Sequence, residues 1–165
     1  MSKTVIFGNS GSGKSTLAKQ LSASDTVAHM DLDAIAWLPS TPPTRAPLEQ
    51  SKQHINAFIQ AHNKWVIEGC YADLIELVMP MAEHLVFMNL PIEACIANAR
   101  ARPWEPHKYP SKAEQDANLA MLIEWIEQYA TRTDEFSQCR HQQLYDDFGG
   151  SKTMVTANNQ YNSSI

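Results

Sequence analysis

A glycine-rich segment near the N-terminus has the residue types and spacing of a phosphate-binding loop. Its three glycines allow successive backbone N–H groups to converge on one point, and a following helix would aim its positive end at the same point. We expect Lys14 to bridge the β- and γ-phosphates of a nucleoside triphosphate, Ser15 to bind Mg²⁺ and Thr16 to reach the α-phosphate. The motif is complete, which makes a chance glycine turn a poor explanation. The residues expected to bind ATP are Gly8, Asn9, Ser10, Gly11, Ser12, Gly13, Lys14, Ser15 and Thr16.

Two aspartates, Asp31 and Asp33, follow a short apolar run that predicts the second strand. Carboxylates at this edge of a parallel sheet could position Mg²⁺, orient an acceptor hydroxyl or accept its proton. The alternative is that one of them caps a helix. The fourth expected strand ends at Asn89, where many nucleotide-binding proteins carry an Asp that supports Mg²⁺, and an asparagine brings no charge. Either the metal relies on Ser15 with Asp31 or Asp33, or the metal is only weakly supported at this site.

Arginines adjoin proline-rich segments in two places. Arg100 and Arg102 come at the end of an expected helix, just before Pro103. Arginines on a mobile lid neutralise charge on a transferring phosphoryl group, although the same residues could simply complement a helix dipole. Arg45 lies in the first proline-rich loop, where it could clamp an acidic or phosphorylated acceptor.

The positions of apolar runs predict the elements that hold these residues. Strands are expected over 4–7, 26–30, 65–68, 84–90 and 152–156, and helices over 14–21, 48–62, 74–81, 92–101 and 112–131. The segment 39–47 contains four prolines and is expected to be irregular, and the end of the chain from 158 to 165 is expected to fray. Strands that alternate with helices indicate a parallel sheet covered on both faces, a three-layer α/β/α fold.

Composition limits the class of protein. The 165 residues fit a single domain over 1–165, and 44% hydrophobic with 19% charged residues is typical of a globular chain. No apolar run approaches the roughly 20 residues of a membrane span, and the first strand follows the N-terminus too closely for a signal peptide, so a cytoplasmic protein without a membrane partner is expected. The net charge of −5 argues against a general nucleic-acid surface. Three scattered cysteines, Cys70, Cys95 and Cys139, are expected to be reduced thiols.

Four motifs in this order resemble one known group of proteins. They are the glycine-rich loop over 8–16, Leu32-Asp33-Ala34-Ile35-Ala36-Trp37, Trp65-Val66-Ile67-Glu68-Gly69-Cys70-Tyr71 and Phe87-Met88-Asn89-Leu90-Pro91. The series resembles the small P-loop proteins known as topology modulation proteins or adenylate-kinase-related ATPases, among the nucleoside-monophosphate and shikimate kinase-like enzymes. The resemblance extends over roughly residues 3 to 105, and only the first motif is specific alone.

This resemblance implies a P-loop NTPase fold with a five-stranded parallel sheet of order 2-3-1-4-5 and an arginine lid, expected over about 102–118. It implies that Asp33 faces the acceptor and that Arg100 begins the lid arginines. It also implies that Arg45 and the motif with Glu68, Gly69 and Tyr71 lie near the acceptor. The departures from the family pattern are Cys70 in place of Asn, Asn89 in place of Asp, and few lid arginines.

The combined expectation is a small-molecule or nucleotide kinase that transfers the γ-phosphoryl group of ATP, with Mg²⁺, to an acceptor that the sequence does not name. The alternatives are an ATPase or a nucleotide-dependent regulatory or binding protein without an acceptor. Oligomeric state is left open. The residues expected to be catalytic are Lys14, Asp33, Arg100 and Arg102.

Overall fold

A five-stranded parallel sheet runs through the centre of the computed structural model, which describes residues 2–161. Its strands are β1 (Lys3–Gly8), β2 (Ala28–Asp31), β5 (Trp65–Gly69), β6 (His84–Met88) and β7 (Ser151–Val155). They lie in the order β2-β5-β1-β6-β7, which is 2-3-1-4-5 when these five strands are numbered along the chain. The predicted sheet order is confirmed.

The three central strands are buried on both faces. Every residue of β5 and β6 is buried, as is β1 from Thr4 onward, which explains why the sequence shows continuous apolar runs and not an alternating pattern. β1 pairs with β5 on one side and β6 on the other, so that Ile6 lies opposite both Glu68 and Val86. The end of β5 therefore lies beside the glycine-rich loop that follows β1.

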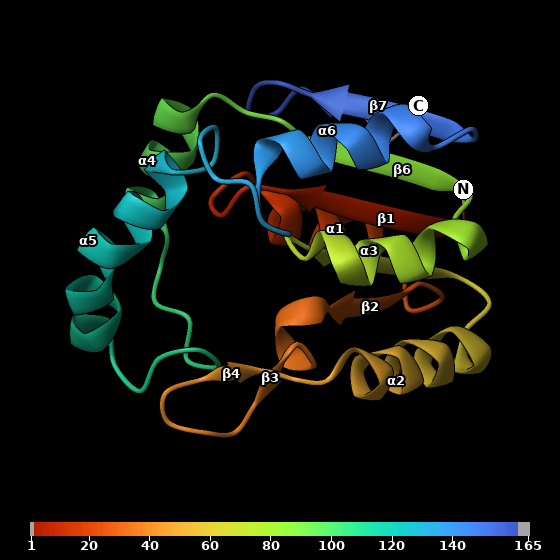
Figure 1. The fold of residues 1–165 in the computed structure, drawn as a ribbon, viewed down its shortest axis with the longest axis horizontal. Helices are drawn as coiled ribbons and strands as arrows, with labels where there is room; N and C mark the ends of the chain where they lie inside the picture. Colours follow the sequence, from red (N-terminus) through yellow and green to blue (C-terminus); the bar gives the residue numbers. More distant parts are fainter. Residues whose placement is uncertain (1, 162–165) are drawn as a thin grey trace.

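Helices cover both faces of the sheet (Figure 1). They are α1 (Lys14–Leu21), α2 (Leu48–Ala61), α3 (Ala72–Val78), α4 (Ile92–Ala101), α5 (Lys112–Glu127) and α6 (Gln138–Asp147). One core packs residues of α2, α3 and α6 against Val5 and Phe7, and the other packs α1, α4 and α5 against Ile6. Alternation of side chains along β1 thus separates the two cores, and the predicted α/β/α layering is confirmed.

Two local predictions were wrong. The proline-rich segment 39–47 is not wholly irregular, because β4 (Thr44–Arg45) pairs antiparallel with β3 (Trp37–Leu38) once the chain has turned back through the prolines between them. The second is the omission of α6, a polar helix in which His141 and Leu144 are the buried residues. Such a helix has too narrow an apolar stripe to be recognised by periodicity.

Smaller differences concern the ends of elements. The helix expected over 74–81 is α3, followed by the 3₁₀ turn η2 (Met79–Met81), and α5 ends at Glu127. Within the end expected to fray, Asn158 exchanges side-chain hydrogen bonds with Asn98, at 2.9 and 3.0 Å, whereas 162–165 lie outside the described residues. Among residues 2–161, none of the helices combines the length and apolar character needed to cross a bilayer.

Candidate functional site

The glycine-rich loop connects β1 to α1 at the carboxyl edge of the sheet. Gly11 and Gly13 have φ angles of 75° and 91°, in the left-handed region that favours glycine. A Cβ atom on Gly11 would lie 2.4 Å from the carbonyl oxygen of Cys95, and one on Gly8 would lie 2.4 Å from that of Met88. Both contacts are with backbone, which cannot move aside, so these positions require glycine.

The back of the loop is fastened to the helices behind it. Asn98 Nδ2 on α4 donates to the Gly11 carbonyl at 2.8 Å, and Asn9 Nδ2 donates to the Ile126 carbonyl on α5 at 3.2 Å. Lys14 Nζ donates to the Asn9 carbonyl at 2.7 Å. The Ser12 hydroxyl is buried and has no hydrogen-bond partner within residues 2–161. Hydrogen bonds to α4 and α5 therefore fix the shape of the loop, and the Ser12 hydroxyl remains available to a ligand.

Glu68, at the end of β5, lies directly beside Ser15. The Ser15 hydroxyl donates to Glu68 Oε1 at 3.0 Å, and the glutamate is only 2% exposed. Its other oxygen, Oε2, is buried without a hydrogen-bond partner in the part of the chain that the structure describes. Burial, reinforced by the nearby charge of Asp31, raises the pKa of Glu68 to about 7. A buried carboxylate with one free oxygen beside a serine hydroxyl is a suitable partner for a cation.

Asn89 directly follows β6, which pairs with β1 beside the glycine-rich loop, but its side chain bonds to other elements. Its Oδ1 accepts from Gln138 Nε2 at 3.0 Å, and its Nδ2 lies 3.8 Å from the sulfur of Met154. The acid beside Ser15 comes instead from β5, the other neighbour of β1.

The two aspartates at the carboxyl end of β2 have different contacts. Asp31 Oδ1 accepts from the backbone N–H of Asp33 at 2.9 Å and caps the 3₁₀ turn η1 (Leu32–Ala34), although the residue also lines the cleft described below. Asp33 accepts a hydrogen bond from the Tyr71 hydroxyl on Oδ1, while Lys108 Nζ lies 3.3 Å from Oδ2. Burial opposes its ionisation, but the Tyr71 hydrogen bond and the charges of Lys108 and Lys14 hold the pKa of Asp33 below its usual range.

A hydrogen-bonded chain continues behind Asp33. Trp37 Nε1 donates to the Tyr71 hydroxyl at 2.8 Å, and burial with the neighbouring Cys70 and Asp33 raises the pKa of Tyr71, which keeps the phenol neutral. Gly69 precedes this chain, and a Cβ there would lie 2.9 Å from the Leu32 Cβ. Tyr71 is thus a fixed donor to Asp33.

Arg45 is placed behind Tyr71 and does not line the cleft. Its Nη2 lies 3.1 Å from both carboxylate oxygens of Asp73, and its guanidinium carbon lies 4.9 Å from the centre of the Tyr71 ring. The structure therefore brings Arg45 and Tyr71 together, but the guanidinium is already paired with Asp73.

His141 supports the loop that follows β5. Its Nε2 donates to the Cys70 carbonyl at 2.8 Å, because a carbonyl can only accept, and its Nδ1 then accepts from the Tyr129 hydroxyl at 2.7 Å. Burial lowers the pKa of His141 to about 4, so the ring stays neutral. This residue was not predicted, because it lies 71 positions from its partner on a helix that the sequence did not reveal.

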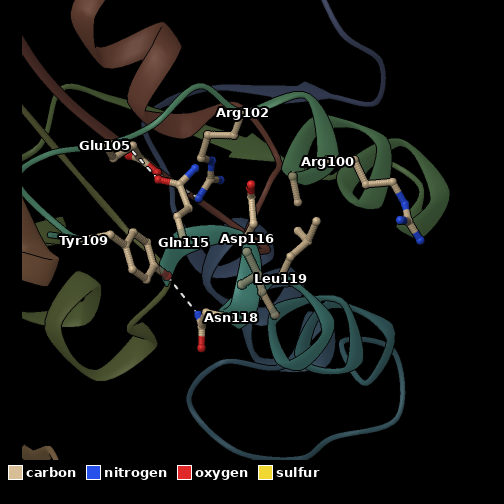
Figure 2. Close-up of a pocket in the computed structure, with 10 residues that line it drawn as sticks. Arg100, Arg102, Glu105, Tyr109, Gln115, Asp116, Asn118 and Leu119 are labelled. Atoms are coloured by element: carbon tan, nitrogen blue, oxygen red, sulfur yellow. Dashed lines mark hydrogen bonds and ion pairs between the residues drawn. The ribbon is translucent and has the colours of Figure 1, made fainter. Parts of the chain in front are cut away.

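Of the two arginines expected at the lid, Arg100 lies within α4, and Arg102 begins the segment between α4 and α5, here called the lid. Arg102 points toward Glu105, with Nη1 3.3 Å from Oε1, whereas the side chain of Arg100 points away (Figure 2). The lid cation that reaches Asp33 is Lys108, which the sequence analysis missed because no local pattern relates residues 75 positions apart.

The lid is also bound to α5. Gln115 Nε2 donates to the Pro103 carbonyl at 3.0 Å, and Gln115 Oε1 accepts from the backbone of Glu105 at 2.8 Å. Asn118 Nδ2 donates to the Tyr109 hydroxyl at 2.8 Å (Figure 2). Side chains of α5 therefore hold the proline-rich lid at both ends.

Two clefts open on either side of the glycine-rich loop. The first, here called the acid cleft, has a volume of about 350 Å³ and is lined on one wall by Asp31, Asp33 and Glu68 and on the other by Glu105 and Lys108 of the lid. The second, the amide cleft, has a volume of about 550 Å³; its wall combines apolar groups of Leu17, Met88, Val155 and Tyr161 with amides of Asn98 and Asn158. Both clefts are lined by Gly11, Gly13, Thr16 and Arg102.

The arrangement fits a nucleotide and a magnesium ion. The amide cleft offers apolar walls and hydrogen-bonding amides at a size suited to a nucleoside. No group of three or more His, Cys, Asp or Glu side chains among residues 2–161 is disposed to hold a metal alone. Ser15 and Glu68, with Asp31 in the same cleft, would suit Mg²⁺, which keeps several waters and takes further ligands from phosphate.

Comparison with known proteins gives fold-level similarity only. No family model matches the chain, and no match was found among curated proteins. The chain is similar to TT1252 from Thermus thermophilus, at 14% identity over 94% of this chain and 88% of the other, with a TM-score of 0.49. It is also similar to an unliganded sugar kinase from Janibacter sp. HTCC2649, at 11% identity over 93% and 83% of the two chains, with a TM-score of 0.48. Both scores lie below 0.5, so the function must be sought in the chemistry of the two clefts.

Proposed function

We propose that this chain is an ATP-dependent phosphotransferase that uses Mg²⁺ and moves the γ-phosphoryl group of ATP to a small-molecule hydroxyl. The observation that carries the proposal is the pair of Ser15 and Glu68 beside Lys14, with one carboxylate oxygen unpartnered among the described residues, opening into a cleft that contains ionised Asp33. Phosphoryl transfer depends on positioning and charge neutralisation, and this edge of the sheet supplies groups for both.

The nucleotide would occupy the amide cleft with its phosphates in the loop. Lys14 Nζ, now bonded to the Asn9 carbonyl, would turn to the β- and γ-phosphates, and the free hydroxyl of Ser12 would gain a partner. Ser15 and Glu68, with Asp31, would hold Mg²⁺, which supplies neutralisation of phosphate charge when bound. Arg102 lines both clefts and is therefore the lid arginine that we assign to the phosphoryl group, in preference to Arg100.

Asp33 would orient the acceptor and take its proton. Its carboxylate is ionised and fixed by Tyr71, so it can accept a hydrogen bond from a hydroxyl placed toward the γ-phosphate. Lys108 keeps this carboxylate turned into the acid cleft.

Calorimetric titration with Mg·ATP tests the nucleotide site. Lys14→Ala should lower the affinity by at least 100-fold, about 2.8 kcal/mol, whereas the control Lys52→Ala on the exposed side of α2 should bind as the wild type does. Near-normal affinity of the Lys14 variant would refute the site. Measurement of ADP release with and without acceptors then separates the classes: turnover without any acceptor would identify an ATPase, and binding without turnover a regulatory module.

A further inference from the structure

Asn98 on α4 joins the glycine-rich loop to the segment that follows β7. Its Nδ2 donates to the Gly11 carbonyl at 2.8 Å and to Asn158 Oδ1 at 2.9 Å. Its Oδ1 accepts from Asn158 Nδ2 at 3.0 Å. Both N–H groups of the Asn98 amide are therefore used, and one side chain bonds two segments that lie 87 and 60 positions away.

The sheet brings these two segments to the same edge. β6 pairs with β1 on one side and with β7 on the other, so that Met88 lies opposite both Gly8 and Val155. Because the strands are parallel, the chain leaves β1 and β7 in the same direction, at points separated by two strand spacings, about 10 Å. α4 follows the strand between them, and Asn98 on this helix bonds to both sides.

The segment over 156–161, here called the β7 loop, has hydrogen bonds of its own. Gln160 Oε1 accepts from the backbone N–H groups of Thr156 and Ala157, at 2.7 and 3.1 Å. Tyr161 packs against the core formed with α1, α4 and α5. The β7 loop is therefore folded, and the amide pair described above connects it to the glycine-rich loop.

The glycine-rich loop and the β7 loop both line the amide cleft. Gly11 and Gly13 belong to the first loop, and Asn158, Asn159 and Tyr161 belong to the second. A nucleotide with its phosphates on the glycine-rich loop would place its nucleoside beside the β7 loop. Tight binding of the whole molecule then requires that the two loops already stand at the right distance from each other, since ordering them on binding would cost affinity.

We propose that Asn98 is a positioning residue for the nucleotide, which holds the β7 loop at the distance from the glycine-rich loop that one nucleoside triphosphate requires. This inference rests on the phosphotransferase function proposed above. Both N–H groups of Asn98 are committed to protein partners, so its role is to preorganise the cleft. The triphosphate has its own contacts with the glycine-rich loop and Lys14, so loss of the amide pair should weaken only the binding of the nucleoside part.

Calorimetry with two ligands tests the inference: Mg·ATP, and Mg·tripolyphosphate, which has the phosphates without the nucleoside. Asn158→Ala breaks the amide pair and leaves the bond from Asn98 to Gly11. We expect this variant to bind Mg·ATP about fivefold more weakly, as the net loss of one hydrogen bond predicts, and Mg·tripolyphosphate as the wild type does. Asn63→Ala, at an exposed asparagine outside both clefts, is the matched control and should bind both ligands unchanged. Equal losses for the two ligands, or no loss for Mg·ATP, would overturn the inference.

A double-mutant cycle separates positioning from direct contact with the ligand. If Asn98 and Asn158 act through their bond to each other, the variant with both alanines should bind Mg·ATP as Asn98→Ala does, within about twofold. If Asn158 instead contacts the nucleotide independently of Asn98, the two losses should add, and the positioning role would be refuted. Asn158 is exposed, so its single variant decides the inference if the Asn98 variants do not fold.

The wild-type affinities distinguish a failure of this inference from a failure of the proposed function. If Mg·ATP binds no more tightly than Mg·tripolyphosphate, the nucleoside is not recognised, and the inference is wrong while the phosphate site stands. If neither ligand binds, both proposals fail.

Discussion

The two ends of the candidate site differ in how fully their polar groups are used. At the phosphate end, the Ser12 hydroxyl and Glu68 Oε2 are buried without partners within residues 2–161, and Lys14 bonds a backbone carbonyl. At the acceptor end, Trp37, Tyr71 and Asp33 form one hydrogen-bonded chain, with Lys108 added from the lid.

The polar groups of the phosphate end need a ligand to complete their hydrogen bonds, whereas those of the acceptor end already bond to one another. A buried polar atom without a partner costs about 1–3 kcal/mol, so the phosphate end gains stability when a ligand and a cation supply the missing bonds. The acceptor end is already satisfied and offers one carboxylate oxygen, Asp33 Oδ2, to a ligand. The following experiments test the two ends separately.

The largest effect is expected at Gly11. Gly11→Ala would place a methyl group 2.4 Å from the Cys95 carbonyl oxygen at a φ of 75°, and the loop would have to change shape. We expect the affinity for Mg·ATP to fall about 1,000-fold, roughly 4 kcal/mol. Gly149→Ala is the matched control, since nothing lies within 4 Å of its Cβ. Calorimetry that gave equal affinities for the two variants would contradict the shape assigned to the loop.

The second test uses the opposite pH dependences of two buried groups, Glu68 at the phosphate end and His141 behind the loop that follows β5, measured by urea unfolding in EDTA. Glu68 has a pKa raised to about 7, so its contribution to stability is complete below its ordinary value of 4.5 and is lost as pH rises through 7. His141 has a pKa lowered to about 4, so its contribution is present above its ordinary value of 6.5 and is lost as pH falls through 4. The pH-dependent contribution of each group to the free energy of unfolding amounts to about 3 kcal/mol at most.

Variants separate these opposing trends. Glu68→Gln should make the free energy of unfolding rise more steeply from pH 4.5 to 7 than in the wild type, and His141→Gln should make it rise less steeply or fall. Identical slopes in the three proteins would show that neither group titrates in the folded state as its burial implies.

A smaller effect is expected from the lid arginines. Arg102→Ala removes a cation that lines both clefts, so the affinity for Mg·ATP should fall about tenfold, roughly 1.4 kcal/mol. Arg100→Ala removes a side chain that points away from Arg102 and Glu105 and should leave the affinity within twofold. A larger loss of Mg·ATP affinity in Arg100→Ala than in Arg102→Ala would indicate that Arg100, and not Arg102, contacts the nucleotide.

The smallest effect is expected at Lys108. Lys108→Met removes a partly exposed ion pair with Asp33, and hydrogen exchange of the lid amides over 103–111 should accelerate about threefold, roughly 0.7 kcal/mol. Lys112→Met, which breaks a more exposed pair with Asp116, should not change exchange in these amides. Equal acceleration in both variants would mean that Lys108 does not hold the lid.

Features carried by neighbouring residues were predictable from the sequence. The glycine-rich loop is one such feature, because strand, loop and helix follow each other directly. Sheet order came from the resemblance to known proteins, and the alternation of strands and helices gave the layers. The same resemblance led us to expect Asp33 and Tyr71 near the acceptor, and the structure joins these two residues by a hydrogen bond.

Features that depend on distant contacts were not predictable. The strands on both sides of β1 were expected there, but which of their ends supplies the partner of Ser15 depends on a side-chain contact between residues 53 positions apart. Arg45 was expected to be a free clamp because its partner Asp73 is 28 positions away. Which charged side chains neutralise one another depends on the fold, so the sequence alone does not show that Arg45 is paired.

The hydrogen bonds from Gln115 and Asn118 to the lid have a kinetic consequence. Because both ends of the proline-rich segment are bonded to α5, the segment cannot swing open as an independent flap unless these bonds break. We expect opening to carry a whole helix as a rigid body about hinges at the ends of α4 and α5, a motion in the microsecond-to-millisecond range. Such an enzyme would release its product at a rate set by helix displacement, and turnover would then be nearly the same for every acceptor that fits.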